Sequence, residues 1–173
     1  MARWLEFKAL APNLVALEER ARGFDAEYLD ERTQQDLHLD FPDGQLMLRR
    51  YDRPPGELIT YRRGAFEGLA LADVEVAEGG DVREVAAMLR GRFGLRVEVE
   101  KTRRVFQWRA TRIHLDQVFR LGMYVEVVSA IDARDEAATA IELREALVRL
   151  GLEVSPPEPR SYADLILATH PGG

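Results

Sequence analysis

The sequence predicts an α+β fold, an eight-stranded antiparallel β-barrel that forms a tunnel and carries covering helices. Three observations lead to this class. About eight segments alternate between polar and apolar residues, which is the period of a β-strand. Nearly all of them follow one another as hairpins, which favours antiparallel pairing. Charged residues repeatedly share one strand face while apolar residues share the other, and eight strands close into a barrel that can hold one small ligand.

Residues 97–116 show this arrangement most clearly. Alternation places Lys101 and Arg103 on a strand face with three valines. After a turn at 109–111, one face of the return strand carries Arg112, His114 and Asp116. Cations among valines suit a wet cavity better than an ordinary surface or core. The only lysines of the chain, Lys8 and Lys101, both lie in such strands, a pattern that two residues can also produce by chance.

In the first half of the chain, the strand predicted at 3–10 directs Trp4, Glu6 and Lys8 toward the cavity. Pro12 is expected to open a helix that ends at Gly23. The other strands predicted in this half cover 34–41, 45–51, 57–63 and 69–77, with a hairpin turn at Pro42-Asp43-Gly44.

In the second half, Asp81 is the expected N-cap of a helix that runs to Gly94. A strand at 123–128 places Glu126 and Val128 on one face. A helix is expected over 135–150, ended by Gly151. Its predicted apolar stripe consists of Ala138, Ile141, Leu143, Leu147 and Leu150. A short helix at 161–168 follows a proline-rich segment.

Composition limits the classes of function. A length of 173 residues suits one domain over 1–173. The net charge of −6 argues against nucleic-acid binding. Because no apolar run approaches the roughly 20 residues of a membrane span, no membrane association and a cytoplasmic location are expected. Cationic strands in an acidic chain favour a small, dense polyanion held inside the barrel.

Several motifs then point to a family. In order, the chain contains L-E-F-K, Q-Q-D-L-H-L-D-F-P-D-G-Q-L-M-L-R, E-L-I-T-Y-R-R, E-K-T-R-R-V-F, T-R-I-H-L-D-Q-V-F-R-L-G-M-Y-V-E-V and S-Y-A-D-L-I. Together they resemble the CYTH, or triphosphate tunnel metalloenzyme, superfamily, and within it the class IV adenylate cyclase-like branch. The resemblance runs from Trp4 to Ile166.

The resemblance implies an eight-stranded tunnel that binds a triphosphate with Mg²⁺ or Mn²⁺. It implies a class IV adenylate cyclase or a metal-dependent triphosphate hydrolase, acting on ATP, thiamine triphosphate or tripolyphosphate; a homodimer is compatible with it. The implied phosphate ligands are Lys8, Arg49, Arg63, Lys101, Arg103 and Arg112. Glu6 and Glu126 would ligate metal, and Asp116 would complete the metal shell or orient a basic residue. Glu6, Lys8 and Glu126 are the candidate catalytic residues.

Three positions depart from the family pattern. The first acid of its E-x-E-x-K motif is Trp4 here, the lysine of its L-K-L-R strand is Met47, and the second acid of its late E-x-E pair is Val128. Two alternatives to an enzyme therefore stay open. One is a catalytically weakened or inactive module that binds nucleotide or polyphosphate, and the other is a structural or partner-binding barrel.

Five side chains also allow two interpretations. His38 and His114 suit hydrogen-bonded histidines better than metal ligands. Trp4 suits packing better than stacking on a base. Tyr162 and its neighbour Asp164 are expected to dock the C-terminal segment onto the barrel end, with capping of the tunnel mouth as the alternative.

Overall fold

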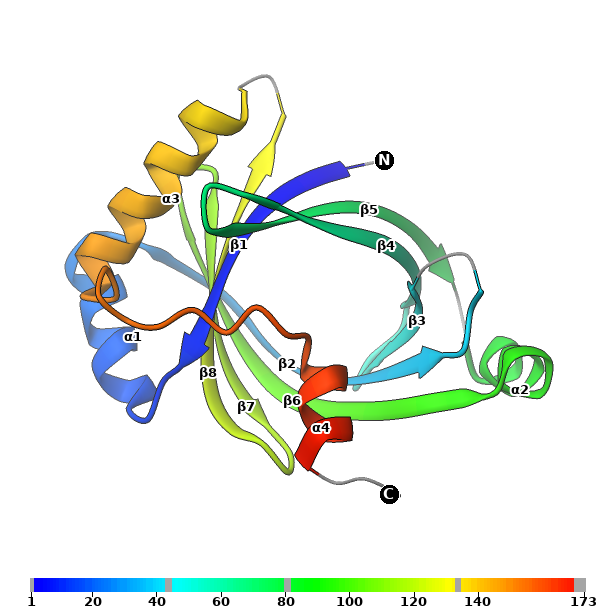
Figure 1. The fold of residues 1–173 in the computed structure, drawn as a ribbon. Coiled ribbons are helices and arrows are strands. Elements are labelled where there is room, and N and C mark those ends of the chain that lie inside the picture. The colour runs from blue at the N-terminus through cyan, green and yellow to red at the C-terminus, as the bar shows by residue number, and fades with distance from the viewer. Residues whose placement is uncertain (1, 43–44, 80–81, 133–134, 170–173) are drawn as a thin grey trace.

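The computed structural model describes residues 2–42, 45–79, 82–132 and 135–169. Eight antiparallel strands close into a barrel in the order β1-β5-β4-β3-β2-β6-β7-β8, and Figure 1 looks into it. The strands are β1 (Ala2–Leu10), β2 (Glu27–Leu39), β3 (Gln45–Tyr51), β4 (Gly56–Phe66), β5 (Leu69–Gly79), β6 (Leu95–Trp108), β7 (Thr111–Val118) and β8 (Gly122–Ile131). The predicted fold class is therefore confirmed.

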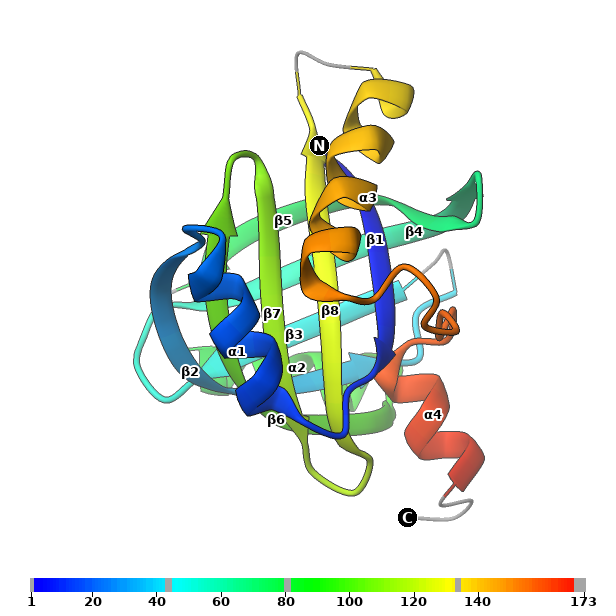
Figure 2. The same cartoon turned by 90° about the vertical axis from the view of Figure 1, so that its left-hand side faces the viewer.

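Four helices of the described chain cover the outside of this barrel. They are α1 (Leu14–Gly23), α2 (Val82–Phe93), α3 (Glu136–Leu150) and α4 (Tyr162–Thr169). Helix α3 packs along β8, β1 and β7, and α1 packs beside it, as Figure 2 shows. Helix α2 contacts β2 and β3, and α4 contacts β6. No helix among the described residues is long and apolar enough to cross a membrane.

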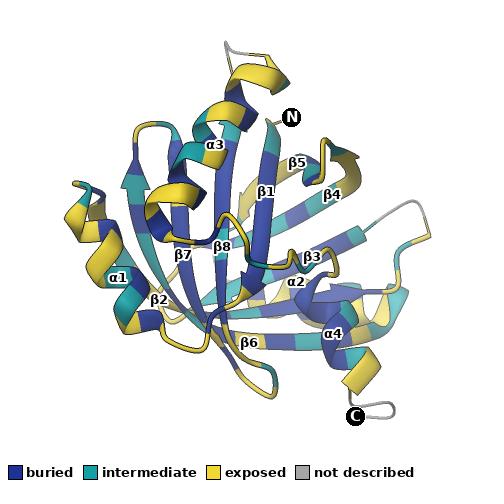
Figure 3. Ribbon diagram, turned by 60° about the vertical axis from the view of Figure 1, so that its left-hand side comes forward, coloured by how far each residue is buried: buried dark blue, intermediate teal, exposed yellow. Residues whose placement is uncertain are grey.

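The main apolar core lies outside the barrel, between the sheet and helices α1 and α3. Outward-facing side chains such as Leu5, Phe106 and Ile113 pack there with Leu143 and Leu147. Figure 3 shows the resulting buried stripes on the strands beneath α3. Because strand side chains alternate, the same strands direct every second residue into the barrel. The core thus leaves the barrel interior available for a site.

Several strands are longer than predicted. Strand β2 begins at Glu27 rather than at residue 34, because its first half pairs with β6 as far as Gln107. Those added residues are mostly polar and exposed, so they carry no alternating apolar signal. Asp43 and Gly44 of the predicted turn, and the predicted N-cap Asp81, lie outside the described residues.

The predicted apolar stripe of α3 is partly wrong. Leu143, Leu147 and Leu150 are buried as expected, but Ala138 is exposed and Ile141 is 67% exposed. Their places on the inner face are taken by Thr139, Ala140 and Ala146. Small residues at these positions allow the helix backbone to approach the sheet closely. The predicted helix ends are confirmed, with Asp135 as N-cap and Gly151 in the left-handed conformation.

Candidate functional site

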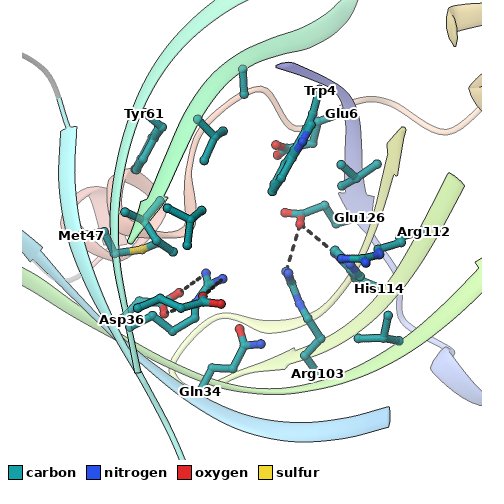
Figure 4. A pocket seen from close by; sticks show the side chains of 18 of the residues that line it. Trp4, Glu6, Gln34, Asp36, Met47, Tyr61, Arg103, Arg112, His114 and Glu126 are labelled. Atoms are coloured by element: carbon teal, nitrogen blue, oxygen red, sulfur yellow. Dashed lines mark hydrogen bonds and ion pairs between the residues drawn. The ribbon is translucent and has the colours of Figure 1, made fainter. Parts of the chain in front are cut away.

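The barrel encloses a cavity of about 660 Å³ lined by side chains from all eight strands and by Tyr162 of α4. Figure 4 shows charged groups reaching into it from several walls. Every predicted phosphate ligand lines this cavity, as do Glu6 and Glu126. Asp116 does not; it is fully buried in the wall behind them. The alternation in the sequence therefore places these side chains correctly on the inner face.

One ionic group of the tunnel is formed by Asp36, Arg49 and Lys101. Arg49 donates from Nε and Nη2 to the two carboxylate oxygens of Asp36, at 2.7 and 2.9 Å. Lys101 Nζ donates to Asp36 Oδ2 at 2.5 Å. Burial disfavours the ionised carboxylate, but the charges of Arg49 and Lys101 outweigh burial and lower the pKa of Asp36. The sequence assigned no role to Asp36, although the alternation of residues 34–41 puts it on one strand face with His38.

A second ionic group surrounds Arg103. Its Nε and Nη2 atoms donate to Asp116 at 2.7 and 2.6 Å, and Nη2 also lies 3.0 Å from Glu126 Oε1. Tyr162 donates its hydroxyl to Asp116 Oδ2 at 2.8 Å. Both Asp116 oxygens are thus engaged, so this carboxylate orients Arg103. The hydrogen bond from Tyr162 ties α4 to the barrel, so Tyr162 docks the C-terminal segment, and its side chain also lines the cavity.

Glu6 and Glu126 form a carboxylate pair on neighbouring strands. In the register of β1 with β8, Lys8 faces Glu126 and Glu6 faces Val128, so the two glutamates are diagonal neighbours on one face. Burial and the negative charge of Glu126 raise the pKa of Glu6. Burial opposes ionisation of Glu126 as well, but the charge of Arg103 and the hydrogen bond from His114 hold its pKa well below the usual range.

Three cations line the tunnel near this carboxylate pair. Lys8 Nζ lies 3.9 Å and Arg63 Nη2 lies 3.6 Å from Glu6 Oε1. Lys8 also sits 4.8 Å from the centre of the Tyr162 ring. Arg112 is exposed and donates from Nε to Gln107 Oε1 at 3.3 Å. Burial lowers the pKa of Lys8. Lys8 and Arg63 thus lie farther from Glu6 than Arg49 lies from Asp36 or Arg103 from Asp116.

The opposite wall of the tunnel is apolar. Met47, Ile59, Ala72 and Val74 are buried together there, and Trp4 and Tyr61 pack against them. We call these six residues the apolar wall. Two of the three family departures, Trp4 and Met47, belong to it, and the third, Val128, lines the same cavity. The sequence showed the three replacements but did not predict the apolar wall. The residues of this wall come from four strands, β1, β3, β4 and β5, which only the closed barrel brings together.

His38 gives a testable pH dependence. It is buried in the tunnel wall, and burial, with the nearby charges of Lys101 and Arg49, lowers its pKa to about 4 from 6.5 despite the opposing charge of Asp36. A depressed pKa stabilises the fold above pH 6.5, and this stability is lost as pH falls toward 4. As pH falls from 6.5 to 4, the unfolding free energy of the wild type should decrease by about 3 kcal/mol more than that of His38→Gln. Denaturant unfolding at a series of pH values measures this, and parallel profiles would contradict it.

Comparisons with known proteins identify the family. A model of the CYTH domain matches residues 3–162. This chain belongs to the CYTH domain family. The resemblance inferred from its motifs is therefore confirmed. CYTH proteins bind triphosphate substrates in a metal-dependent manner. No curated protein sequence matches the chain significantly.

Solved structures share the CYTH fold at low sequence identity. A protein of Pyrococcus horikoshii OT3 is similar with a TM-score of 0.83 and 19% identity, covering 95% of this chain and 99% of that chain. A candidate adenylate cyclase of Vibrio parahaemolyticus has a TM-score of 0.76 and 19% identity over 94% and 97% of the two chains. An RNA triphosphatase of Schizosaccharomyces pombe has a TM-score of 0.50 and 12% identity over 87% and 81%.

The metal dependence of CYTH proteins raises the question of which side chains suit a metal ion. Among the residues that the structure describes, no group of three or more His, Cys, Asp or Glu side chains is placed to hold one. Glu6 and Glu126 supply two hard carboxylates on one face of the tunnel. Mg²⁺ is commonly held by one or two carboxylates with water and substrate phosphates. Glu6 and Glu126 therefore suit an ion that is also coordinated by the phosphate oxygens of a ligand. They suit an ion coordinated by protein side chains alone less well.

Proposed function

We propose that the tunnel binds a triphosphate-containing small molecule together with Mg²⁺ or Mn²⁺, and that residues 1–173 act as one CYTH domain. The observation that carries this proposal is the convergence of Glu6 and Glu126 with Lys8, Arg63 and Arg103 inside one enclosed cavity. A triphosphate has about four negative charges, and its recognition depends on positioned cations. Glu6 and Glu126 would hold the ion, and the cations would hold phosphate oxygens.

The chemistry proposed for this site is phosphoryl or nucleotidyl transfer, either cyclisation of ATP or hydrolysis of a triphosphate. The ion, when bound, polarises a phosphorus centre and lowers the pKa of the attacking hydroxyl or water. The tunnel residues would position the ligand. Lys8 and Arg63 would neutralise charge on its oxygens, and Asp116 would orient Arg103 toward it. Such positioning and charge stabilisation account for most catalysis of this kind.

A second candidate is a binding module with little or no catalytic activity. The residues at two positions where the family pattern has acids favour this candidate. Trp4 and Val128 stand where the family pattern has acids, so Glu6 and Glu126 have fewer partners for an ion. Phosphate release and cyclic AMP formation, each measured with and without Mg²⁺ and Mn²⁺, separate the two candidates. Ligand binding without turnover would assign the chain to the binding module.

Thermal unfolding with ATP, thiamine triphosphate and tripolyphosphate, each with and without Mg²⁺ or Mn²⁺, tests the proposal. A ligand at about 100 times its dissociation constant should stabilise the fold by about 2.7 kcal/mol. Arg63→Gln should reduce this stabilisation, because it removes a cation from the tunnel. Arg62→Gln is the matched control, since the neighbouring residue points away from the cavity. No stabilisation by any of the three ligands would support a structural barrel instead.

A further inference from the structure

The tunnel interior is divided between a charged side and the apolar wall. The charged side carries the two ionic groups around Asp36 and Arg103. The apolar wall consists of Trp4, Met47, Ile59, Tyr61, Ala72 and Val74. In Figure 4, Trp4 and Tyr61 lie across the cavity from Arg103, and Met47 lies between Tyr61 and the Asp36 group. A ligand that fills this cavity therefore meets charge on one side and hydrocarbon or ring surface on the other.

The cations of the charged side are already strongly paired. Arg49 and Lys101 share Asp36, and Arg103 is bound by Asp116 and Glu126. Each pair reduces the positive charge available to a ligand, because carboxylate and phosphate oxygens compete for the same donors. Charge alone therefore supplies less binding free energy than the number of tunnel cations suggests. Contact with the apolar wall is a second source of binding free energy, and it is open only to a ligand with apolar surface.

Gln34 provides an independent observation on the charged side of the tunnel. Its side chain lines the cavity, the residue is 4% exposed, and its Oε1 atom is buried without a hydrogen-bond partner in the structure. Figure 4 shows this side chain directed into the tunnel. A buried acceptor without a partner is unfavourable until a donor reaches it. Ionised phosphate oxygens are acceptors, so a hydroxyl or N–H group, as on the nucleoside of ATP, is the better partner, whereas a pure hydrocarbon chain supplies no donor.

We propose that the tunnel selects a phosphate ester whose organic group lays an aromatic ring or hydrocarbon chain against the apolar wall, and that it discriminates against inorganic oligophosphates. This inference rests on the proposed function and narrows its substrate class. The cavity volume of about 660 Å³ is within the range of pockets that enclose whole organic ligands. An inorganic oligophosphate has no apolar surface to place against Met47, Ile59 or Val74.

Isothermal titration of two pairs of ligands with equal phosphate numbers tests the selection. The pairs are tripolyphosphate with ATP, and pyrophosphate with geranyl diphosphate, all in the presence of Mg²⁺. In at least one pair, the organic member should bind about tenfold more tightly, which corresponds to burial of roughly 55 Å² of apolar surface. A preference for ATP alone identifies a ring as the group on the wall, and a preference for geranyl diphosphate alone identifies a hydrocarbon chain.

Met47 offers a matched pair of variants. Met47→Gln keeps the length of the side chain but makes it polar, and should remove most of the organic preference without weakening the inorganic ligands. Met47→Leu keeps an apolar surface of similar volume and should retain the preference.

A second measurement leaves the apolar wall unchanged. In a Trp108→Phe variant, Trp4 is the only tryptophan, and its fluorescence should respond to the organic ligand and not to its inorganic partner.

The outcomes separate this inference from the proposed function. Equal affinity within both pairs would overturn the selection while leaving phosphate binding in the tunnel intact. If Met47→Gln weakens binding of the organic and the inorganic ligand of a pair equally, the selection is overturned as well. The apolar wall would then affect binding only by stabilising the fold. If none of the four ligands binds and thiamine triphosphate does not stabilise the fold either, the proposed function fails and the inference fails with it.

Discussion

Replacement of Asp36 by asparagine is expected to lower the free energy of unfolding by about 3–5 kcal/mol. Asp36 accepts both hydrogen bonds of the Arg49 fork and the ammonium of Lys101. Lys101 is 3% exposed, so water cannot take over the role of the carboxylate. The asparagine variant would remove the carboxylate that contacts the buried ammonium of Lys101 and would leave Arg49 with only Glu57, 3.9 Å from its Nη1 atom. This costs more than the loss of a surface ion pair. Urea unfolding near neutral pH measures the difference.

Asp30→Asn is the control on the same strand. Asp30 pairs with Arg32, but both side chains are substantially exposed, so the loss of unfolding free energy should be much smaller than that for Asp36→Asn. The large loss for Asp36→Asn should also shrink in acid. Because the pKa of Asp36 is lowered from 3.8, its stabilisation is present above that value and is lost as pH falls below it. Similar losses for the two variants near neutral pH would mean that the ionic group contributes little to the fold.

The Asp36→Asn variant also tests whether the tunnel carboxylates weaken the binding of phosphate ligands. Without Asp36, Lys101 loses the carboxylate that it contacts and Arg49 keeps only Glu57 at 3.9 Å, so phosphate oxygens meet less competition for the N–H groups of both residues. We therefore expect tripolyphosphate to stabilise Asp36→Asn more than it stabilises the wild type. The fold would be weaker and phosphate binding stronger, two changes that a general loss of structure cannot produce together.

The double variant Trp4→Glu/Val128→Glu is expected to strengthen binding of Mn²⁺ by at least about tenfold, or 1.4 kcal/mol. Both positions line the tunnel, and Val128 faces Glu6 across the strands. Two additional carboxylates beside Glu6 and Glu126 provide the hard oxygen ligands that divalent ions prefer. Titration of Mn²⁺ by electron paramagnetic resonance gives the affinity directly, without any need for turnover.

The metal-free double variant should be less stable than the wild type, because it gathers like charges around Glu6, whose pKa is already raised by burial and by Glu126. Mn²⁺ should restore much of this stability. Trp4→Gln/Val128→Gln, which is neutral, should gain neither the affinity nor the metal-dependent stabilisation. If metal capture also limits catalysis, turnover rises with affinity. Tighter Mn²⁺ binding without faster turnover would exclude that explanation for a slow enzyme.

Much of the site followed from the sequence because strand alternation is a local property. A period of two residues assigns Lys8, Arg49, Lys101 and Arg103 to inner faces whatever their partners are. Apolar residues on the opposite faces predicted the covering helices, and the motifs predicted the family. The prediction of the apolar stripe of α3 was less accurate, because the alanines that lie against the sheet carry little apolar signal in the sequence.

The sequence by itself determined that the predicted phosphate ligands, Glu6 and Glu126 lie on inner strand faces, since the face of each strand is set by neighbouring residues. Only the tertiary structure decided how those side chains combine. Asp36 meets Lys101 across the pairing of β2 with β6, and Glu126 meets Arg103 only because β7 lies between β6 and β8. The apolar wall likewise forms only when β1 pairs with β5 and closes the barrel. Such contacts depend on strand order and register, which long-range hydrogen bonding sets and local periodicity does not.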